Sequence, residues 1–300
     1  MTLTTALKAL LATAFWGASF IATKIALREI TPLTVVVLRF ALGVGVLLAL
    51  LAWRRQAAIA RRRDLGWLAL LGLNGITVHQ LLQSTGLLTT TATNSGWMVA
   101  LIPVFTAVLA RLMLREAFGA LKAIGLAVAS AGALVIVGRG HVSTNLFGAA
   151  TTGDALVLLS AVNWALFTTL SKRFIGRYAP AVMMAHVITF GWLLSLPLFG
   201  MAGGWQDVPH MSSAGWAAVL FLGIGCSGIA YAFWYDALAH TDASSLASFQ
   251  YFQPIVTVAV AAAVLGEAVS WSMAAGGTAI LFGVWLVNRA PRRGVESPTG

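Results

Sequence analysis

The sequence predicts an all-α integral membrane protein with ten transmembrane helices as two inverted five-helix repeats. Three observations support this fold class: an apolar composition, ten apolar segments each long enough to cross a bilayer, and a set of residues that recurs 151 positions later in the chain. Together the ten segments leave too little chain for a water-soluble domain.

The composition is that of a protein that resides in lipid. Hydrophobic residues make up 59% of the 300 residues, charged residues only 9%, and the mean hydropathy is +0.87, whereas soluble domains contain roughly 25% charged residues. The net charge of +10 does not indicate nucleic-acid binding, because the Lys and Arg residues stand at the ends of apolar runs rather than on one solvated face. The single cysteine, Cys226, cannot form an internal disulfide.

Ten segments have the properties of a membrane-spanning helix, which needs about 20 mainly apolar residues. In chain order they are residues 7–27, 34–53, 65–86, 92–114, 120–138, 153–174, 180–201, 213–238, 243–264 and 271–288. The first is longer than the apolar core of a secretory signal and contains Lys24 near its end, so we interpret it as the first helix. The polar residues 290–300 are expected to form a disordered cytoplasmic tail.

The basic residues predict the orientation of the chain, because Lys and Arg beside a span stay preferentially in the cytoplasm. With the N-terminus inside, fifteen of the 19 Lys and Arg residues lie on the inner side, and only Lys24, Arg28 and Arg139 lie on the outer side. The remaining one, Arg39, lies within the second segment. We therefore expect a multi-pass protein of the inner (cell) membrane with cytoplasmic N- and C-termini.

Landmark residues recur at a nearly constant separation, which indicates an internal repeat. Pairs that are 151 residues apart are Pro103 and Pro254, Glu116 and Glu267, Gly125 and Gly276, and Gly132 and Gly283; Trp16 and Trp164 are 148 apart. The repeats then span residues 1–140 and 150–289, with five helices each. Because five is odd, the second copy is inverted, a plan that recurs in secondary transporters whose substrate site lies near the membrane midplane.

The paired residues also have structural interpretations. Glu116 and Glu267 each follow one helix and precede the next, so we expect their carboxylates to bind the free amides of the next helix and to organise tight turns. The paired glycines are seven residues apart and should allow two helices to approach closely. Pro103 and Pro254 are expected to kink the fourth and ninth helices, and paired kinks can also open a central cavity.

These features resemble a known family over nearly the whole chain. The run "LRFALGVGVLLALL" after "TPLTVVV", the block "LREAFGALKAIGLAVASAGALVIV" and its echo "LGEAVSWSMAAGGTAILFGVWLV" are similar to EamA-type members of the drug/metabolite transporter superfamily. The resemblance implies ten helices in two inverted five-helix repeats and the export of small metabolites, amino acids often among them. One departure is that Arg39 has Val187 as its equivalent; we interpret Arg39 as reaching toward the outer interface, with one-sided gating as the alternative.

Polar and aromatic residues at mid-membrane depth are the candidates for a substrate site, because such residues are costly in lipid unless they face a bundle interior or a wet cavity. They are Trp16, His79, Gln83, Asn94 and Trp97 in the first repeat, and Asn163, Trp164, Trp234, Ser248 and Phe252 in the second. Repeat pairing predicts that Trp16 faces Trp164, Gln83 faces Trp234 and Trp97 faces Ser248. The alternative for such aromatic residues is ordinary packing or anchoring at the interface.

The residue types suit a zwitterionic or neutral substrate. An indole offers an apolar face and one N–H donor, and imidazole and amide groups can bind an ammonium and a carboxylate without placing a net charge in the membrane. All nine Asp and Glu residues lie at or beyond the predicted helix ends, so a carboxylate proton relay at the midplane is not expected. The sequence also lacks metal-ligand spacing, a nucleophile elbow and a phosphate-binding glycine loop, so we expect no catalytic residue, metal or cofactor.

The sequence therefore predicts a secondary carrier that exports small metabolites, above all aromatic or other apolar amino acids, by alternating access at a midplane cavity. The expected partners are the small-molecule substrate and the lipid bilayer, and the sequence leaves the oligomeric state open. Two alternatives stay open at this point: a multidrug exporter of lipophilic cations, and a non-transporting membrane protein such as an interfacial enzyme.

The distribution of basic residues gives a testable topology. In a Cys226→Ser background, a cysteine placed at Ala57, in the basic loop after the second segment, should not react in whole cells with an impermeant thiol reagent. A cysteine placed at Asp207, between the seventh and eighth segments, should react. Labelling of the Ala57 position from outside would contradict the predicted orientation.

Overall fold

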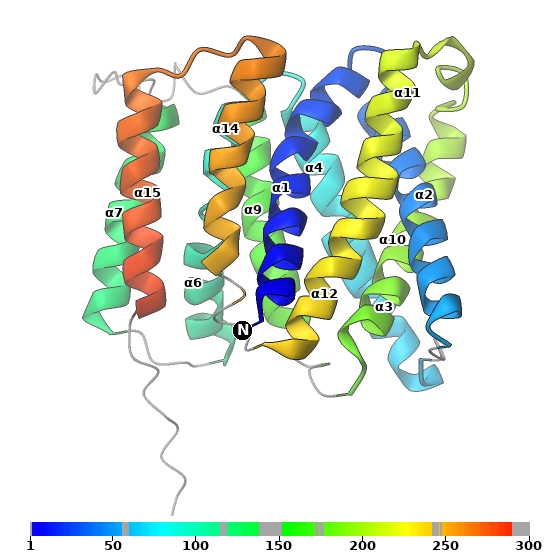
Figure 1. The fold of residues 1–300 in the computed structure, drawn as a ribbon, viewed down its shortest axis with the longest axis horizontal. Coiled ribbons are helices and arrows are strands. Elements are labelled where there is room, and N and C mark those ends of the chain that lie inside the picture. The colour runs from blue at the N-terminus through cyan, green and yellow to red at the C-terminus, as the bar shows by residue number, and fades with distance from the viewer. Residues whose placement is uncertain are drawn as a thin grey trace, which may run out of the picture.

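This computed structural model describes residues 2–55, 60–114, 119–137, 152–171, 174, 177–241, 246 and 248–289, and the secondary structure in these ranges is helical. The helices stand side by side in one slab with roughly parallel axes (Figure 1). Those of the first half are α1 (Leu3–Ala26), α2 (Pro32–Trp53), η1 (Arg62–Asp64), α3 (Leu65–Gly72), η2 (Leu73–Val78), α4 (His79–Gly86), α5 (Ala92–Val99), α6 (Ile102–Leu114) and α7 (Ala120–Val137).

The second half contributes a comparable series. It consists of α9 (Thr152–Ser171), α10 (Pro180–Met201), η4 (Val208–His210), α11 (Ser213–Leu220), η5 (Phe221–Ile229), α12 (Ala230–His240), η6 (Ser248–Tyr251), α14 (Phe252–Leu265) and α15 (Trp271–Arg289). The start of α1 and the end of α15 lie on the same face of the slab (Figure 1).

Within the described ranges, seven helical stretches are long and apolar enough to cross a membrane. They are Leu3–Ala26, Pro32–Trp53, Arg62–Gly86, Ala92–Met113, Thr152–Ser171, Pro180–Met201 and Ser213–Leu238. Three further apolar helices are shorter: Ala120–Ile136, Phe249–Leu265 and Trp271–Leu286. Each stretch coincides with one of the predicted segments, although the ninth begins later than expected, so the all-helical membrane class is confirmed.

Short polar side chains determine where several helices begin. Thr2, Thr31, Thr91 and Ser212 precede α1, α2, α5 and α11, and each side chain accepts the backbone N–H three residues later. A capping oxygen of this kind contributes about 1 kcal/mol. It matters here because amides of a first helical turn that enter lipid have no water to bind.

Helices of the two halves exchange equivalent contacts. α1 packs against α14 and α12, and its counterpart α9 packs against α6 and α4. Likewise α2 packs against η5, α10 packs against η2, and α7 and α15 pack against each other as a pair (Figure 1). Each contact between the halves is therefore matched by a second contact between the corresponding elements.

The close approach of α7 and α15 depends on glycine, as the sequence predicted. A Cβ atom on Gly132 would lie 2.5 Å from the carbonyl oxygen of Gly276, and one on Gly276 would lie 2.6 Å from that of Gly132. A Cβ atom on Gly283 would lie 2.5 Å from the carbonyl oxygen of Gly125. Backbone cannot yield as a flexible side chain can, so these positions exclude any larger residue at this helix separation.

The stretch made of α3, η2 and α4 and the stretch made of α11, η5 and α12 each contain a π-helical segment, η2 in one half and η5 in the other. Their last residues, Val78 and Ile229, are 151 positions apart and therefore occupy equivalent places in the repeat. A π turn inserts an extra residue into the helix, rotates the side chains that follow and is frequent at functional sites. His79 directly follows η2, so its orientation depends on this turn.

The two repeat-related prolines lie in the first turns of helices. Pro103 is the second residue of α6, after an interruption between Val99 and Ile102, and Pro254 is the third residue of α14, directly after the 3₁₀ segment η6. The predicted kink is thus a change of helix type or a break just before each proline. In the first turn of a helix a backbone N–H has no intrahelical acceptor, so proline, which lacks this N–H, breaks no hydrogen bond there.

The glycine contact can be tested by a single methyl group. Gly276→Ala should lower the free energy of unfolding by about 1–3 kcal/mol, because the added Cβ meets the backbone of α7. Gly45→Ala is the matched control, since a Cβ on this exposed glycine of α2 meets nothing within 4 Å. Thermal denaturation in detergent measures both, and equal stability of the two variants would contradict the packing described here.

Candidate functional site

The interior where the two halves meet is rich in aromatic rings. The indole of Trp16 lies 5.3 Å from the ring of Tyr231 and 5.2 Å from that of Trp234, both on α12, in edge-on and tilted geometries. Its Nε1 donates to the carbonyl oxygen of Cys226 at 3.1 Å. Tyr231 also stacks on Tyr235 with the ring centroids 6.2 Å apart. Such pairs add about 0.5–1.5 kcal/mol beyond the burial of area, so these residues form one rigid aromatic set.

Trp164, the equivalent of Trp16 in the predicted repeat, forms a second set with residues of both halves. Its ring centroid lies 4.8 Å from that of His79 and 4.8 Å from that of Phe167. His79 is buried, and its Nδ1 is 3.0 Å from the carbonyl oxygen of Ser160. Because a carbonyl only accepts, Nδ1 carries the hydrogen and Nε2 of the neutral ring is an acceptor. The ring contacts described for Trp16 are therefore to α12 and those for Trp164 to α4 and α9; that the two indoles face each other stays a prediction.

Arg39 of α2 lies buried next to these sets, at 3% exposure, and does not reach the outer interface as the sequence suggested. Its Nε donates to Oγ of Ser227 at 3.1 Å, and its Nη1 donates to Oε1 of Gln80 at 3.0 Å. The guanidinium carbon is 5.1 Å from the ring centroid of Phe40. The expectation failed because the two acceptors come from η5 and α4, which only the folded chain brings beside α2.

The candidate amides lie at different depths. Asn163, in the middle of α9, donates through Nδ2 to Oδ1 of Asn74 in η2 at 2.7 Å and so links the two halves. Gln83 is buried on α4, one helical turn after His79. Asn94 lies in the first turn of α5, and its Nδ2 donates to Oδ1 of Asp154 at 3.4 Å. Only Asn163 and Gln83 therefore belong to the interior beside the aromatic sets.

Two of the predicted candidates lie elsewhere. Trp97 packs toward α7 and α15, and a Cβ atom on Gly277 would come within 2.4 Å of its ring. Phe252 is 39% exposed and lines an apolar groove of about 500 Å³ together with residues that include Leu10, Phe249, Leu281 and Trp285. The side chain of Ser248 lies outside the described residues, so its predicted contact with Trp97 stays a prediction.

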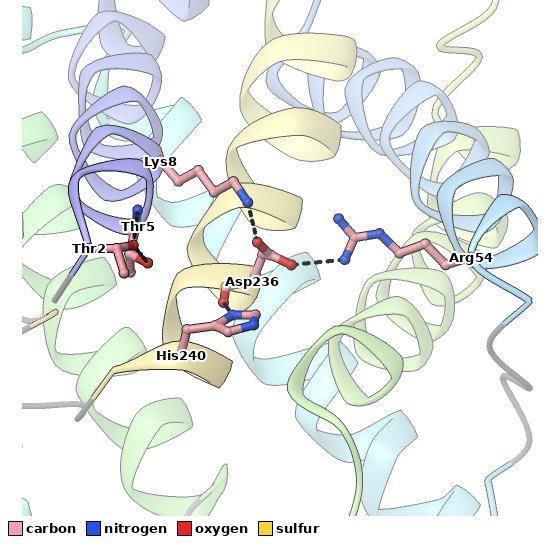
Figure 2. A network of polar contacts seen from close by, with 6 residues as sticks. All are labelled: Thr2, Thr5, Lys8, Arg54, Asp236 and His240. Carbon is pink, nitrogen blue, oxygen red and sulfur yellow. Dashed lines mark hydrogen bonds and ion pairs between the residues drawn. The ribbon is translucent and has the colours of Figure 1, made fainter.

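On the face that carries the N-terminus, Asp236 joins three helices (Figure 2). Lys8 Nζ of α1 lies 2.5 Å from its Oδ2, and Nη1 of Arg54, at the end of α2, lies 3.0 Å from its Oδ1. The two basic side chains are about one-third exposed, so each pair is worth at most about 1 kcal/mol. This network links α1, α2 and α12 by weak ion pairs.

On the opposite face, Glu267 caps a helix of the other half. Its two carboxylate oxygens accept from the backbone amides of Ala92 and Thr93 at 2.9 Å each, in the first turn of α5. The sequence predicted the first turn of the next helix, α15, so the kind of bond is as expected but the helix is a different one. The helix differs because the chain turns at Gly266, where φ is +66°, directly after α14. Glu267 then lies against α5, a neighbour that only the tertiary structure brings near. Glu116 lies outside the described residues.

Other polar groups join helices at this second face. Lys24 Nζ donates to the carbonyl oxygen of Thr90 at 2.5 Å, and the hydroxyl of Thr90 bonds to the buried carboxylate of Asp154 in the first turn of α9. Glu29 accepts from Oγ and N of Ser212 at 2.6 Å and 2.7 Å. These hydrogen bonds from Ser212 hold the pKa of Glu29 below its ordinary value. Interhelical polar contacts are therefore present at both faces of the structure.

Sequence reasoning missed Asn74 and Ser227 as partners of the interior. Both are polar residues within otherwise apolar stretches, and both lie in the repeat-related segments η2 and η5. A polar residue at mid-membrane depth was the sign that could have identified them. Which helix supplies the hydrogen-bond partner of such a residue depends on the packing.

A bundle of apolar helices with a polar and aromatic interior is the architecture expected of a membrane transporter. Comparison with known proteins gives the family: the model of the EamA-like transporter family matches residues 3–138 and again residues 151–289. The chain belongs to this family, and it is a transporter rather than an enzyme.

Individual relatives match along most of their length. An uncharacterized transporter of Archaeoglobus fulgidus is 30% identical over 272 residues, which cover 90% of this chain and 92% of that protein. A probable terminal-alkyne amino-acid exporter of Streptantibioticus cattleyicolor is 30% identical over 247 residues, or 82% of this chain and 80% of that one. A solved crystal structure, 20% identical, covers 99% of this chain with a TM-score of 0.67 and shows the same fold.

The position of Glu267 generates a prediction about stability. Glu267→Gln should lower the free energy of unfolding by about 1–2 kcal/mol, because a neutral amide has one oxygen to accept with and turns its NH₂ group toward the second backbone N–H. Transport per folded molecule should persist, since the carboxylate is occupied by α5. Thermal denaturation and flux of the purified variant measure both; unchanged stability with no flux would instead make Glu267 part of the transport mechanism.

Proposed function

We propose that this transporter exports small zwitterionic or neutral metabolites, above all amino acids with aromatic or other apolar side chains. The site is the interior between the aromatic sets of Trp16 and Trp164, and the mechanism is alternating access. The observation that carries the proposal is the matched arrangement of these sets, one on α1 and α12 and the other on α9 and α4. Equivalent walls contributed by two halves are what an inverted-repeat carrier presents to its substrate.

The two-repeat organisation, residues 1–140 and 150–289 with five inverted helices each, is supported by three findings. The family model matches twice along the chain. Contacts such as those of α1 with α12 and of α9 with α4 occur in corresponding pairs. Seven long and three shorter apolar helices were found in the described residues, which is the number of spans that the repeat requires.

The chemistry of the interior favours an amphipathic substrate. The indole and phenol rings offer apolar faces to a side chain, while His79 and the buried Gln83 offer polar atoms to the substrate's charged ends. The relative from Streptantibioticus cattleyicolor, named as a probable exporter of an amino acid, supports the same class. The buried positive charge of Arg39 disfavours lipophilic cations, because like charges repel strongly in a medium of low dielectric constant.

The interhelical contacts at the two faces supply the gates in this mechanism. Opening toward the face of the N-terminus separates Asp236 from Lys8 and Arg54, and opening toward the other face separates Glu29 from Ser212. In the proposed orientation the N- and C-termini are cytoplasmic and the protein resides in the inner membrane, so that the Asp236 network faces the substrate's source.

The proposal is tested by truncating the aromatic sets. Trp164→Ala and His79→Ala should each reduce amino-acid uptake into proteoliposomes by about 10-fold, because a buried aromatic side chain contributes about 1.5–3 kcal/mol of burial. Trp271→Ala, at an 85% exposed indole, is the matched control and should transport normally. Unchanged flux and substrate range in both site variants, purified and monodisperse, would remove this interior from consideration.

A further inference from the structure

Arg39 is a permanent charge in the interior of a membrane helix bundle. It is the eighth residue of the 22-residue helix α2 and is 3% exposed. Among the described residues neither Asp236 nor Asp64, which pair with other basic side chains, pairs with it. A buried charge without a counter-charge costs several kcal/mol, and such residues in transmembrane helices usually mark a substrate or ion pathway.

The hydrogen bonds that hold the guanidinium are to neutral groups. Of its five N–H donors, the bonds described use the one on Nε and one on Nη1, to the hydroxyl of Ser227 and the amide oxygen of Gln80. These acceptors position the head group but do not neutralise it. The remaining donors on Nη1 and Nη2 form the planar fork that matches the two oxygens of a carboxylate.

The two partners also connect Arg39 to both aromatic sets. Gln80 is the chain neighbour of His79, which contacts Trp164, and Ser227 is the chain neighbour of Cys226, whose carbonyl binds Trp16. The charge therefore lies at the interior where the substrate is proposed to bind, and not in a separate part of the bundle.

We infer that Arg39 binds the carboxylate of the transported substrate, which makes the substrate class that of amino acids and related carboxylic acids. The inference rests on the proposed function and adds the recognition group. A carboxylate accepts two parallel N–H bonds from the guanidinium and supplies the missing negative charge, while the apolar side chain packs against the rings of Trp16 or Trp164. Between transport events Gln80 and Ser227 hold the guanidinium in place.

The recognition is one-sided. The repeat equivalent of Arg39 is Val187, a buried apolar residue on α10. The two halves therefore offer a substrate similar aromatic walls but only one anion-binding group. A carboxylate bound there fixes which end of the substrate faces the first half.

The experiment compares ligands that differ in charged groups. Phenylalanine, its amide, 3-phenylpropionate and 2-phenylethylamine are tested as competitors of phenylalanine uptake into proteoliposomes and as stabilisers of the purified full-length protein. The wild type should prefer phenylalanine and 3-phenylpropionate over the amide and the amine by at least about 10-fold. Arg39→Gln should weaken the two carboxylates by about 10- to 100-fold and leave the weak amide nearly unchanged. Arg39→Lys should be intermediate, since an ammonium keeps the charge but lacks the fork.

Control variants separate recognition from a merely structural role. Arg62→Gln removes an exposed charge and should change nothing. Ser227→Ala removes one neutral partner and should keep the preference for acid over amide. If Arg39→Gln does not fold, the comparison of acid and amide in the wild type still decides the question.

The outcomes also distinguish this inference from the proposed function. Equal affinity of the wild type for phenylalanine and its amide would overturn the role of Arg39 while leaving amino-acid export intact. Stabilisation of the wild type but not of Arg39→Gln by 3-phenylpropionate, with no amino-acid flux, would support the carboxylate site and overturn amino-acid export. Absence of any effect of both carboxylates would overturn both.

Discussion

The structure depends on one constraint: within a bilayer, polar side chains and free backbone amides have no water to bind and must find partners in the protein. Many of the described polar contacts satisfy this constraint between helices that are distant in the sequence, and others bond within one helix. Glu267 caps α5, Asn163 binds Asn74, and Arg39 binds Gln80 and Ser227. Because apolar side chains gain nothing from leaving lipid for each other, such bonds and the close glycine contacts determine which helices are neighbours.

In the proposed mechanism the same constraint gives the α7 and α15 pair and the two faces different roles. The α7 and α15 pair meets through backbone atoms at Gly132 and Gly276, so it has little freedom to slide. The faces are closed by a few ion pairs and capping bonds, each worth about 1 kcal/mol. A transporter built in this way can open at either face while one glycine-packed contact keeps the halves together. The π turns η2 and η5 lie between these regions, at equivalent depth in the two halves.

The candidate site combines residues that have equivalents in both halves with residues that have none. Trp16 and Trp164 have corresponding positions in the predicted repeat, and each packs on a helix of the other half, through Trp234 of α12 and His79 of α4 respectively. The partners differ in chemistry, an indole on one side and an imidazole on the other, and Arg39 has no charged counterpart. In the proposed mechanism the symmetric elements supply a path with two equivalent walls, and the asymmetric residues supply the preference for one end of a substrate.

The sequence by itself determined the membrane class, the approximate position of every apolar helix, the glycine contact between α7 and α15 and the resemblance to the family, because these follow from local hydropathy and from residues repeated at a constant separation. Only the tertiary structure decided that Glu267 binds α5, that Arg39 lies inside and that Trp97 packs toward α15. The physical reason is that the local sequence shows that a buried polar or aromatic side chain needs a partner. Which residue becomes that partner depends on which helices pack together, and this packing is not a local property of the sequence.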